Sequence, residues 1–128
     1  MADTWHTPDV SENTVLPLSA ESELLARREA ALRSVGYRVL SMMSEVHVRF
    51  EIEMGQCGVL LLCYTIHQSI HSDLAQLFTQ RCQSGVIAFV MHPKTREPSP
   101  HAHVCFLDSD FPHKLHLIKG ARTRQKSA

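Results

Sequence analysis

The side chains best suited to chemistry in this sequence are four cysteines and nine histidines. Cys63, His67 and His71 follow one another at intervals of four residues, and His92 is predicted to lie at the same end of a sheet. A zinc site would need three or four such side chains to converge with free lone pairs. Because no tight pair such as Cys-x-x-Cys anchors the pattern, we predict no bound metal, with His67, His71 and His92 as the candidates if one binds.

Cys63 supports a second chemical hypothesis, that of a reactive or regulatory thiol. It lies late in a strongly apolar run and is therefore predicted at the carboxyl end of a central strand, where open α/β sheets usually bind ligands. A low thiol pKa needs a helix amino terminus, a cation or an imidazole nearby, and only His67 or His92 is placed to supply one. A thiol- or metal-based redox sensor that uses Cys63 is the alternative function, and a buried structural cysteine is the simpler interpretation.

Composition excludes several broad classes of protein. The chain has 128 residues and a mass of 14.5 kDa, enough for one core, with 13 basic and 13 acidic side chains and a pI near 7.1. This balance creates no overall positive field to hold nucleic acid or an anionic membrane. The longest apolar stretch, Val59 to Tyr64, is far shorter than a membrane span. The polar opening residues and widely spaced cysteines predict a cytoplasmic protein with free thiols.

Sequence motifs of the common enzyme classes do not occur. The chain has no phosphate-binding loop, no glycine-rich dinucleotide fingerprint and no nucleophile elbow. We therefore predict that the protein is not an enzyme and holds no cofactor.

Short apolar runs alternate with helical patterns through residues 13–119, the predicted folded domain, between flexible tails at residues 1–12 and 120–128. Strands are predicted at Val15–Leu18, Tyr37–Met42, Val59–Thr65, Val86–Met91 and Val104–Leu107. Helices are predicted from a cap at Ser19 or Ser22 through Val35, over Ser69–Cys82, and from a cap at Asp110 past Leu115 and Ile118, which point inward. The inner stripe of the first helix is Leu24, Leu25, Ala31, Leu32 and Val35.

One segment has a conflicting pattern. From Val46 to Met54 apolar and polar residues alternate strictly, which favours a strand, whereas helical spacing survives only in Val48 with Ile52 and in Phe50 with Met54. A helix is still predicted, because parallel strands need crossovers and continuous apolar strands need cover on both faces. A true strand here would make the fold α+β and the family resemblance described next accidental.

Three stretches of the chain resemble the response-regulator receiver domain. The family's opening strand, helix and second strand are similar to residues 15–40, V-L-P-L-S-A-E-S-E-L-L-A-R-R-E-A-A-L-R-S-V-G-Y-R-V-L. Its third and fourth strands are similar to G-V-L-L-L-C-Y-T-I at residues 58–66 and G-V-I-A-F-V-M at residues 85–91. The resemblance covers roughly residues 15–119. It implies a three-layer α/β sandwich with a mostly parallel, five-stranded, flavodoxin-like sheet.

The residues that perform phosphorylation in the family are missing at the matching positions. A receiver accepts a phosphoryl group on an aspartate at the end of its third strand, beside an acidic pair that holds Mg²⁺. The resemblance puts the phosphoacceptor position on Cys63 and the acidic pair on Ser19 and Ala20, none of which carries a carboxylate. The family's switch threonine or serine falls near Val90, and its lysine falls near Asp108. We therefore predict that the phosphorylation apparatus is absent.

Two further features bear on the family's usual output. Residues 92–101, H-P-K-T-R-E-P-S-P-H, occupy the place of a receiver's fourth helix, and their proline content predicts a loop instead. Receivers commonly pass their signal through the face that includes this helix, so this chain is predicted to use another mode. Glu21 and Asp108 remain as acids that could form a makeshift Mg²⁺ site.

These departures predict a degenerate receiver, or pseudo-receiver, that acts alone in bacterial two-component signalling or a phosphorelay. Its expected partner is a signalling protein of unknown identity, contacted without covalent chemistry. Nucleic acid and membranes are not expected partners, and a weak homodimer is a further expectation.

Overall fold

The computed structural model describes residues 13–42, 44–55, 57–82, 84–114, 116–118 and 120–121. The predicted tails, residues 1–12 and all but the first two residues of 120–128, lie outside these ranges, as does Leu115. None of the helices in these ranges combines the length and the hydropathy that a membrane span requires.

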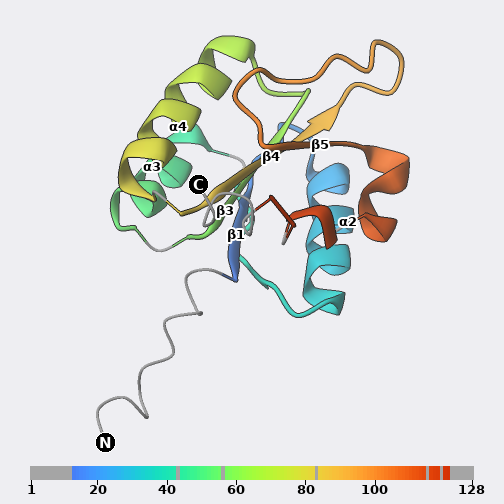
Figure 1. The fold of residues 1–128 in the computed structure, drawn as a ribbon, viewed down its shortest axis with the longest axis horizontal. Coiled ribbons are helices and arrows are strands. Elements are labelled where there is room, and N and C mark those ends of the chain that lie inside the picture. Colours follow the sequence, from blue (N-terminus) through green and yellow to red (C-terminus); the bar gives the residue numbers. More distant parts are fainter. Residues whose placement is uncertain are drawn as a thin grey trace, which may run out of the picture.

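Five parallel strands form one sheet in the order β2-β1-β3-β4-β5 (Figure 1). They are β1 (Thr14–Pro17), β2 (Arg38–Val39), β3 (Val59–Cys63), β4 (Val86–Met91) and β5 (Val104–Leu107). The central strand, β3, is buried along its whole length, which explains why its residues are apolar without alternation. Its first and last residues pair with Val86 and Val90 of β4. The predicted parallel five-stranded sheet is confirmed.

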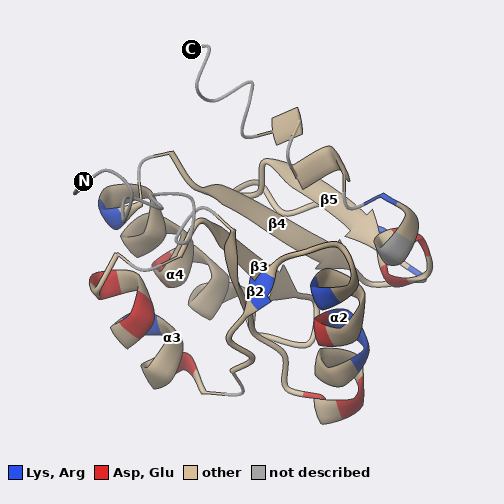
Figure 2. Ribbon diagram, turned by 90° about the horizontal axis from the view of Figure 1, so that it is seen from below, with Lys and Arg blue, Asp and Glu red and all other residues tan. Residues whose placement is uncertain are grey.

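Helices cover both faces of this sheet (Figure 1 and, turned by 90°, Figure 2). One face carries α2 (Ser22–Ser34) and the 3₁₀ helix η2 (Asp108–His113), and the other carries α3 (Glu45–Glu53) and α4 (Gln68–Arg81). Successive strand residues point to opposite faces. Val59 and Leu61 of β3 therefore share a core cluster with α2, whereas Leu60 and Leu62 share one with α3 and α4. The predicted three-layer sandwich is confirmed.

The segment with the conflicting pattern is the helix α3. It turns Val48 and Ile52 inward, where both are wholly buried, and leaves Val46 and Phe50 71% and 59% exposed. Apolar residues stand on two opposite faces of one helix, and for that reason their order along the sequence imitates a strand. The predicted helix is confirmed, and the α+β alternative is wrong.

The first helix, α2, departs from prediction at both ends. Glu21 precedes its first turn and no side chain caps it, while the predicted cap Ser19 lies in the preceding loop. Val35 is 51% exposed and not part of the inner stripe, because the helix has ended before it and the chain turns away at Gly36, where φ is 98°. The charged side chain of Arg28 faces inward and is only 2% exposed.

Other boundaries also differ from the predicted ones, those of β1 and α4 by a single residue at each end. β2 has two ladder residues, and Met42 joins the sheet through an isolated bridge to Leu18, the residue after β1. β3 ends at Cys63, two residues early. The last helical segment starts as a 3₁₀ helix at Asp108, so Asp110 lies inside it and does not cap it. Ile118 is buried, as predicted.

Residues 92–103 connect β4 to β5 without a helix (Figure 1). Three prolines interrupt this connection, and each lacks the N–H that a helix interior requires. Arg96 adds a left-handed backbone conformation, with φ at 54°. The prediction that a proline-rich loop replaces this helix is confirmed.

Two matched valine substitutions test the two faces of α3. Val48→Ala is expected to lower the free energy of unfolding by about 1–3 kcal/mol, because it opens a cavity in the core. Val46→Ala is expected to change it by less than about 0.5 kcal/mol, because that side chain is already in water. Urea unfolding of both variants measures the difference, and equal losses would contradict the helix, since a strand would put both valines on one face.

Candidate functional site

The strands β1, β3 and β4 end at one edge of the sheet, the edge where parallel α/β sheets bind ligands. Cys63 is the last residue of β3 and is wholly buried, as is its register partner Val90. A buried thiol is closed to an oxidant or substrate, so the hypothesis of a reactive thiol at Cys63 gains no support. Val90 lies inside β4, not after it, and offers only methyl groups to this edge.

Ser19 and Ala20, which follow β1, form hydrogen bonds with Thr65 in the loop that follows β3. The hydroxyl oxygens of Ser19 and Thr65 are 3.2 Å apart, and the Ala20 backbone N–H donates to Thr65 Oγ1 at 3.1 Å. Ser19 Oγ also accepts the Glu21 N–H at 3.1 Å. These neutral hydrogen bonds join the two loops, and the Ser19 side chain between them is wholly buried. Nothing in the sequence pattern singles out Thr65, because the contact depends on which loops the fold brings together.

Asp108, just after β5, is held by two arginines of α2. Arg28 Nε donates to Asp108 Oδ1 at 3.1 Å, and Arg27 Nη2 lies 3.4 Å from Oδ2. The side chains of Arg28 and Asp108 are 2% and 23% exposed, so this pair is largely removed from water. Both carboxylate oxygens are engaged, which leaves Asp108 unsuited to the makeshift Mg²⁺ site predicted with Glu21.

The buried cation Arg28 was not among the predicted site residues, although the sequence carries a signal for it. Leu24, Arg28 and Leu32 are four residues apart and therefore lie on one face of the helix. A cavity of about 80 Å³ borders Arg28 and Asp108, and Arg28 Nη2 has no hydrogen-bond partner within the described residues. The Asp108 carboxylate is thus the main compensation for this buried charge.

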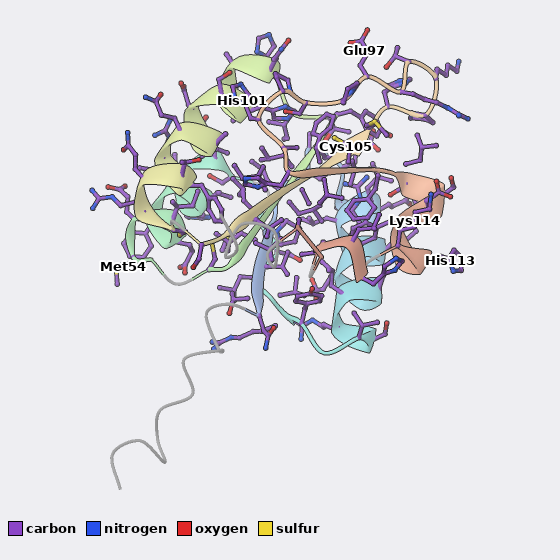
Figure 3. All side chains as sticks on the ribbon, viewed as in Figure 1. Met54, Glu97, His101, Cys105, His113 and Lys114 are labelled. Atoms are coloured by element: carbon purple, nitrogen blue, oxygen red, sulfur yellow. The ribbon has the colours of Figure 1, made fainter. Side chains whose placement is uncertain are left out.

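A cleft of about 450 Å³ opens at the same edge of the sheet, between α4 and the loop of residues 92–103. Its walls include the three histidines named from the sequence, His67, His71 and His92, together with His101. Figure 3 shows Glu97 and His101 on the loop that forms one wall. The remaining lining is mixed: Tyr64, Ile66, Gln68, Phe89, Thr95, Pro98, Ser99 and Pro100.

The imidazoles of this cleft are engaged in separate hydrogen bonds. His71 Nε2 donates to the Cys63 carbonyl oxygen at 2.9 Å. His67 Nδ1 and His92 Nδ1 each accept the backbone N–H two residues further along, at 3.1 and 3.0 Å. In the part of the chain that the structure describes, no three His, Cys, Asp or Glu side chains are arranged to hold a metal ion. The metal hypothesis therefore gains no support.

The surroundings of His71 favour its neutral form. Burial lowers its pKa, and the charges of His101 and His67 lower it further, whereas the hydrogen bond to the Cys63 carbonyl raises it. The ring also packs edge-on against Phe89, with the two centroids 5.2 Å apart. Protonation of His71 would place a charge in this largely apolar setting.

The two thiols that contact each other are Cys57 and Cys82, which lie near the amino ends of β3 and β4. Their hydrogen bond raises the pKa of Cys57, and burial raises it further; the same bond lowers the pKa of Cys82 against the effect of burial. The hypothesis of a reactive thiol, made from the sequence, concerned Cys63, which lies at the opposite end of β3. The Cys57 and Cys82 contact is thus separate from the cleft.

Three solved structures that superpose on this chain are response-regulator receiver domains. A CheY-like receiver domain protein from Methanospirillum hungatei JF-1 superposes with a TM-score of 0.72 and 16% identity, covering 89% of this chain and 96% of that one. A receiver domain protein from Clostridium thermocellum gives 0.70 and 16%, covering 88% and 96%. The receiver domain of the hybrid histidine kinase CckA gives 0.65 and 18%, covering 85% and 98%.

These likenesses show that the chain has the receiver fold. No protein-family model matches the sequence, and no curated protein matches it significantly. The assignment of Ser19, Ala20, Cys63, Val90 and Asp108 to the receiver's phosphorylation positions stays a prediction.

Removing the negative charge of Asp108 tests the buried ion pair. Asp108→Asn is expected to lower the free energy of unfolding by about 2 kcal/mol or more, because it leaves Arg28 charged and uncompensated in the interior. The matched control is Asp110→Asn, whose carboxylate is 41% exposed and pairs with Lys114 at 3.6 Å; it should cost less than about 0.5 kcal/mol. Equal effects of the two substitutions in urea unfolding would contradict the proposed role of Asp108.

The lowered pKa of His71 predicts a specific pH dependence. Above the unfolded value of about 6.5 histidine is neutral in both states; below it the unfolded chain binds a proton more readily, so stability falls as the pH falls toward the folded pKa. His71→Gln should remove this contribution. Unfolding measured at several pH values should therefore show a shallower acid loss in the variant, and identical slopes would contradict the assignment.

Proposed function

We propose that this protein is a degenerate receiver, a signalling module of the two-component type that acts by noncovalent contact with a partner protein. The receiver fold, which spans 85–89% of the chain in the comparisons, supports the assignment to signalling. The observation that supports the absence of phosphorylation is the set of hydrogen bonds that Ser19 and Ala20 make to Thr65 at the carboxyl edge of the sheet.

Phosphoryl transfer to a carboxylate needs groups that this edge does not offer. An acceptor oxygen must be accessible, and oxygen ligands with negative charge must hold Mg²⁺ beside it. Cys63 presents a buried sulfur, and Ser19 and Ala20 bring no charge. The nearest carboxylate after β5, that of Asp108, is already bound by Arg27 and Arg28. The edge is thus stabilised by its own hydrogen bonds and ion pairs, and in this proposal a cation takes no part in it.

A module of this kind signals through its surface. The loop of residues 92–103 replaces a helix of the face that receivers commonly use, so a partner that recognises that face by its helix would find a different shape here. Contact with a partner would then depend on the protein's presence and concentration and not on a covalent mark.

Native mass spectrometry before and after incubation with acetyl phosphate and Mg²⁺ tests the absence of phosphorylation. We expect no species heavier by one phosphoryl group and no retained Mg²⁺, because no accessible carboxylate lies at the end of β3. A receiver domain that has the aspartate, treated in the same solution, serves as the positive control. A phosphorylated species of this chain, with the control also modified, would contradict the proposal.

A further inference from the structure

A small cavity lies between α2 and η2, which pack on the same face of the sheet. Its volume is about 80 Å³, and it is lined by Arg27, Arg28 and Ala31 of α2 and by Asp108 and Phe111 of η2. Figure 1 shows η2, in orange-red, beside α2. The cavity shares no lining residue with the histidine-lined cleft, so it is a separate candidate for ligand binding.

One polar group of a residue that lines this cavity lacks a hydrogen-bond partner. The Arg28 side chain is 2% exposed, and its Nε donates to Asp108 Oδ1 at 3.1 Å, but the described residues give its Nη2 no acceptor. A buried donor without an acceptor costs free energy, and it costs more when the group carries part of a positive charge. An acceptor in the cavity would remove this cost.

The charges around the cavity do not balance. The guanidinium groups of Arg27 and Arg28 share the carboxylate of Asp108, at 3.4 and 3.1 Å, so the lining has two positive groups and one negative group, a net charge of +1. A water molecule would supply an acceptor but leave this charge uncompensated. A single negative charge would neutralise the site, whereas a dianion would put excess negative charge beside Asp108. The charges therefore favour a monoanion.

The rest of the lining is apolar. Ala31 supplies a methyl group, and the buried ring of Phe111 packs edge-on against Phe106, with the two centroids 5.5 Å apart. This wall favours a ligand with an apolar end over a fully hydrated ion, because both apolar surfaces then leave water. Since a water molecule occupies about 30 Å³ of the liquid, the cavity has room for an ion of about three to five heavy atoms.

We propose that this cavity binds a small monocarboxylate, an ion of the size of acetate. One carboxylate oxygen accepts the hydrogen bond of Arg28 Nη2, and the alkyl end lies against Ala31 and Phe111. Arg27, whose side chain is 67% exposed, adds the second positive charge at the outer side. Guanidinium and carboxylate groups form short, charge-assisted hydrogen bonds, which suit this pairing.

The site exists only when α2 packs on η2. The folded protein therefore binds the ion and the unfolded chain does not, so the ligand stabilises the fold. The binding does not depend on the proposed contact with a partner protein, because every residue of the lining belongs to this chain.

Thermal unfolding in sodium acetate at neutral pH tests the site. An ion this small binds weakly, with a dissociation constant of about 1–10 mM, so acetate at about 50 mM should raise the Tm by about 3 °C or more over sodium chloride at equal ionic strength. Acetamide, which has nearly the same shape and no charge, is the matched control and should have no effect. A Tm no higher in acetate than in chloride would overturn the proposal, as would an equal rise in acetamide.

Two substitutions should abolish the response to acetate in different ways. Arg28→Met removes the unpartnered N–H and one positive charge. Ala31→Val leaves every charge in place and fills much of the cavity with two more methyl groups. The matched control is Arg33→Gln, which removes an arginine of α2 that is 59% exposed, pairs with Glu29 at 3.0 Å and lies outside the lining. Its response should equal that of the unaltered chain.

Circular dichroism checks that each variant folds, and Ala31→Val tests the site by itself if Arg28→Met does not fold. A rise of the Tm in acetate that survives in a folded Arg28→Met or Ala31→Val variant would overturn the proposal. Loss of the response in Arg33→Gln would also overturn it, because the effect would then follow surface charge and not the cavity.

Methyl signals of the isotope-labelled protein show where the ion binds. Acetate should shift the Ala31 methyl signal saturably and leave that of Ala75, which is buried on the other face of the sheet, unchanged. An Ala31 signal that does not move while acetate raises the Tm would place the ion elsewhere and overturn the proposal.

Discussion

The constraint on which the structure depends is the burial of β3 on both faces. Its five residues have no polar side, so the strand is stable only with neighbours on both edges and helices on both faces. Parallel pairing with β1 and β4 supplies the edges, and the crossovers that parallel pairing requires supply the helices. One consequence is that the loops after β1, β3 and β4 all emerge at the same edge, which makes that edge the place where side chains distant in sequence meet.

At that edge the chain uses neutral hydrogen bonds and one buried ion pair. The Ser19 and Thr65 hydroxyls join two loops without a charge, and Arg28 with Asp108 joins α2 to the end of β5. The two arrangements differ in the free energy needed to remove their polar groups from water. Hydroxyl pairs need little desolvation, whereas the buried guanidinium is stable only while the Asp108 carboxylate remains opposite it. Together they give an edge that is ordered by its own side chains, and the histidine-lined cleft lies beside it.

Much of the fold could be predicted because its signals are local. Unbroken apolar runs mark β3 and β4, and three prolines between residues 92 and 101 exclude a helix. The site could be predicted only in part. The positions that lack carboxylates are visible in the sequence, but the Ser19 to Thr65 contact links residues 46 positions apart and has no periodic signal. Arg28 had such a signal, because it lies four residues from Leu24 and from Leu32. Val35 was wrongly predicted in the inner stripe of α2, because apolar spacing does not show where a helix ends. The alternation in α3 was ambiguous for a physical reason. When a helix has apolar residues on two opposite faces, apolar residues occur at every second position of its sequence, as they do in a strand.

We propose that the carboxyl edge of this receiver fold needs no cation. Titration of the isotope-labelled protein with excess Mg²⁺, followed by amide chemical shifts, is the decisive experiment. We expect no saturable change at the amides of Ala20 and Glu21, because both N–H groups already donate hydrogen bonds within the chain. Saturable shifts confined to these amides, with stabilisation of the fold by Mg²⁺, would contradict it.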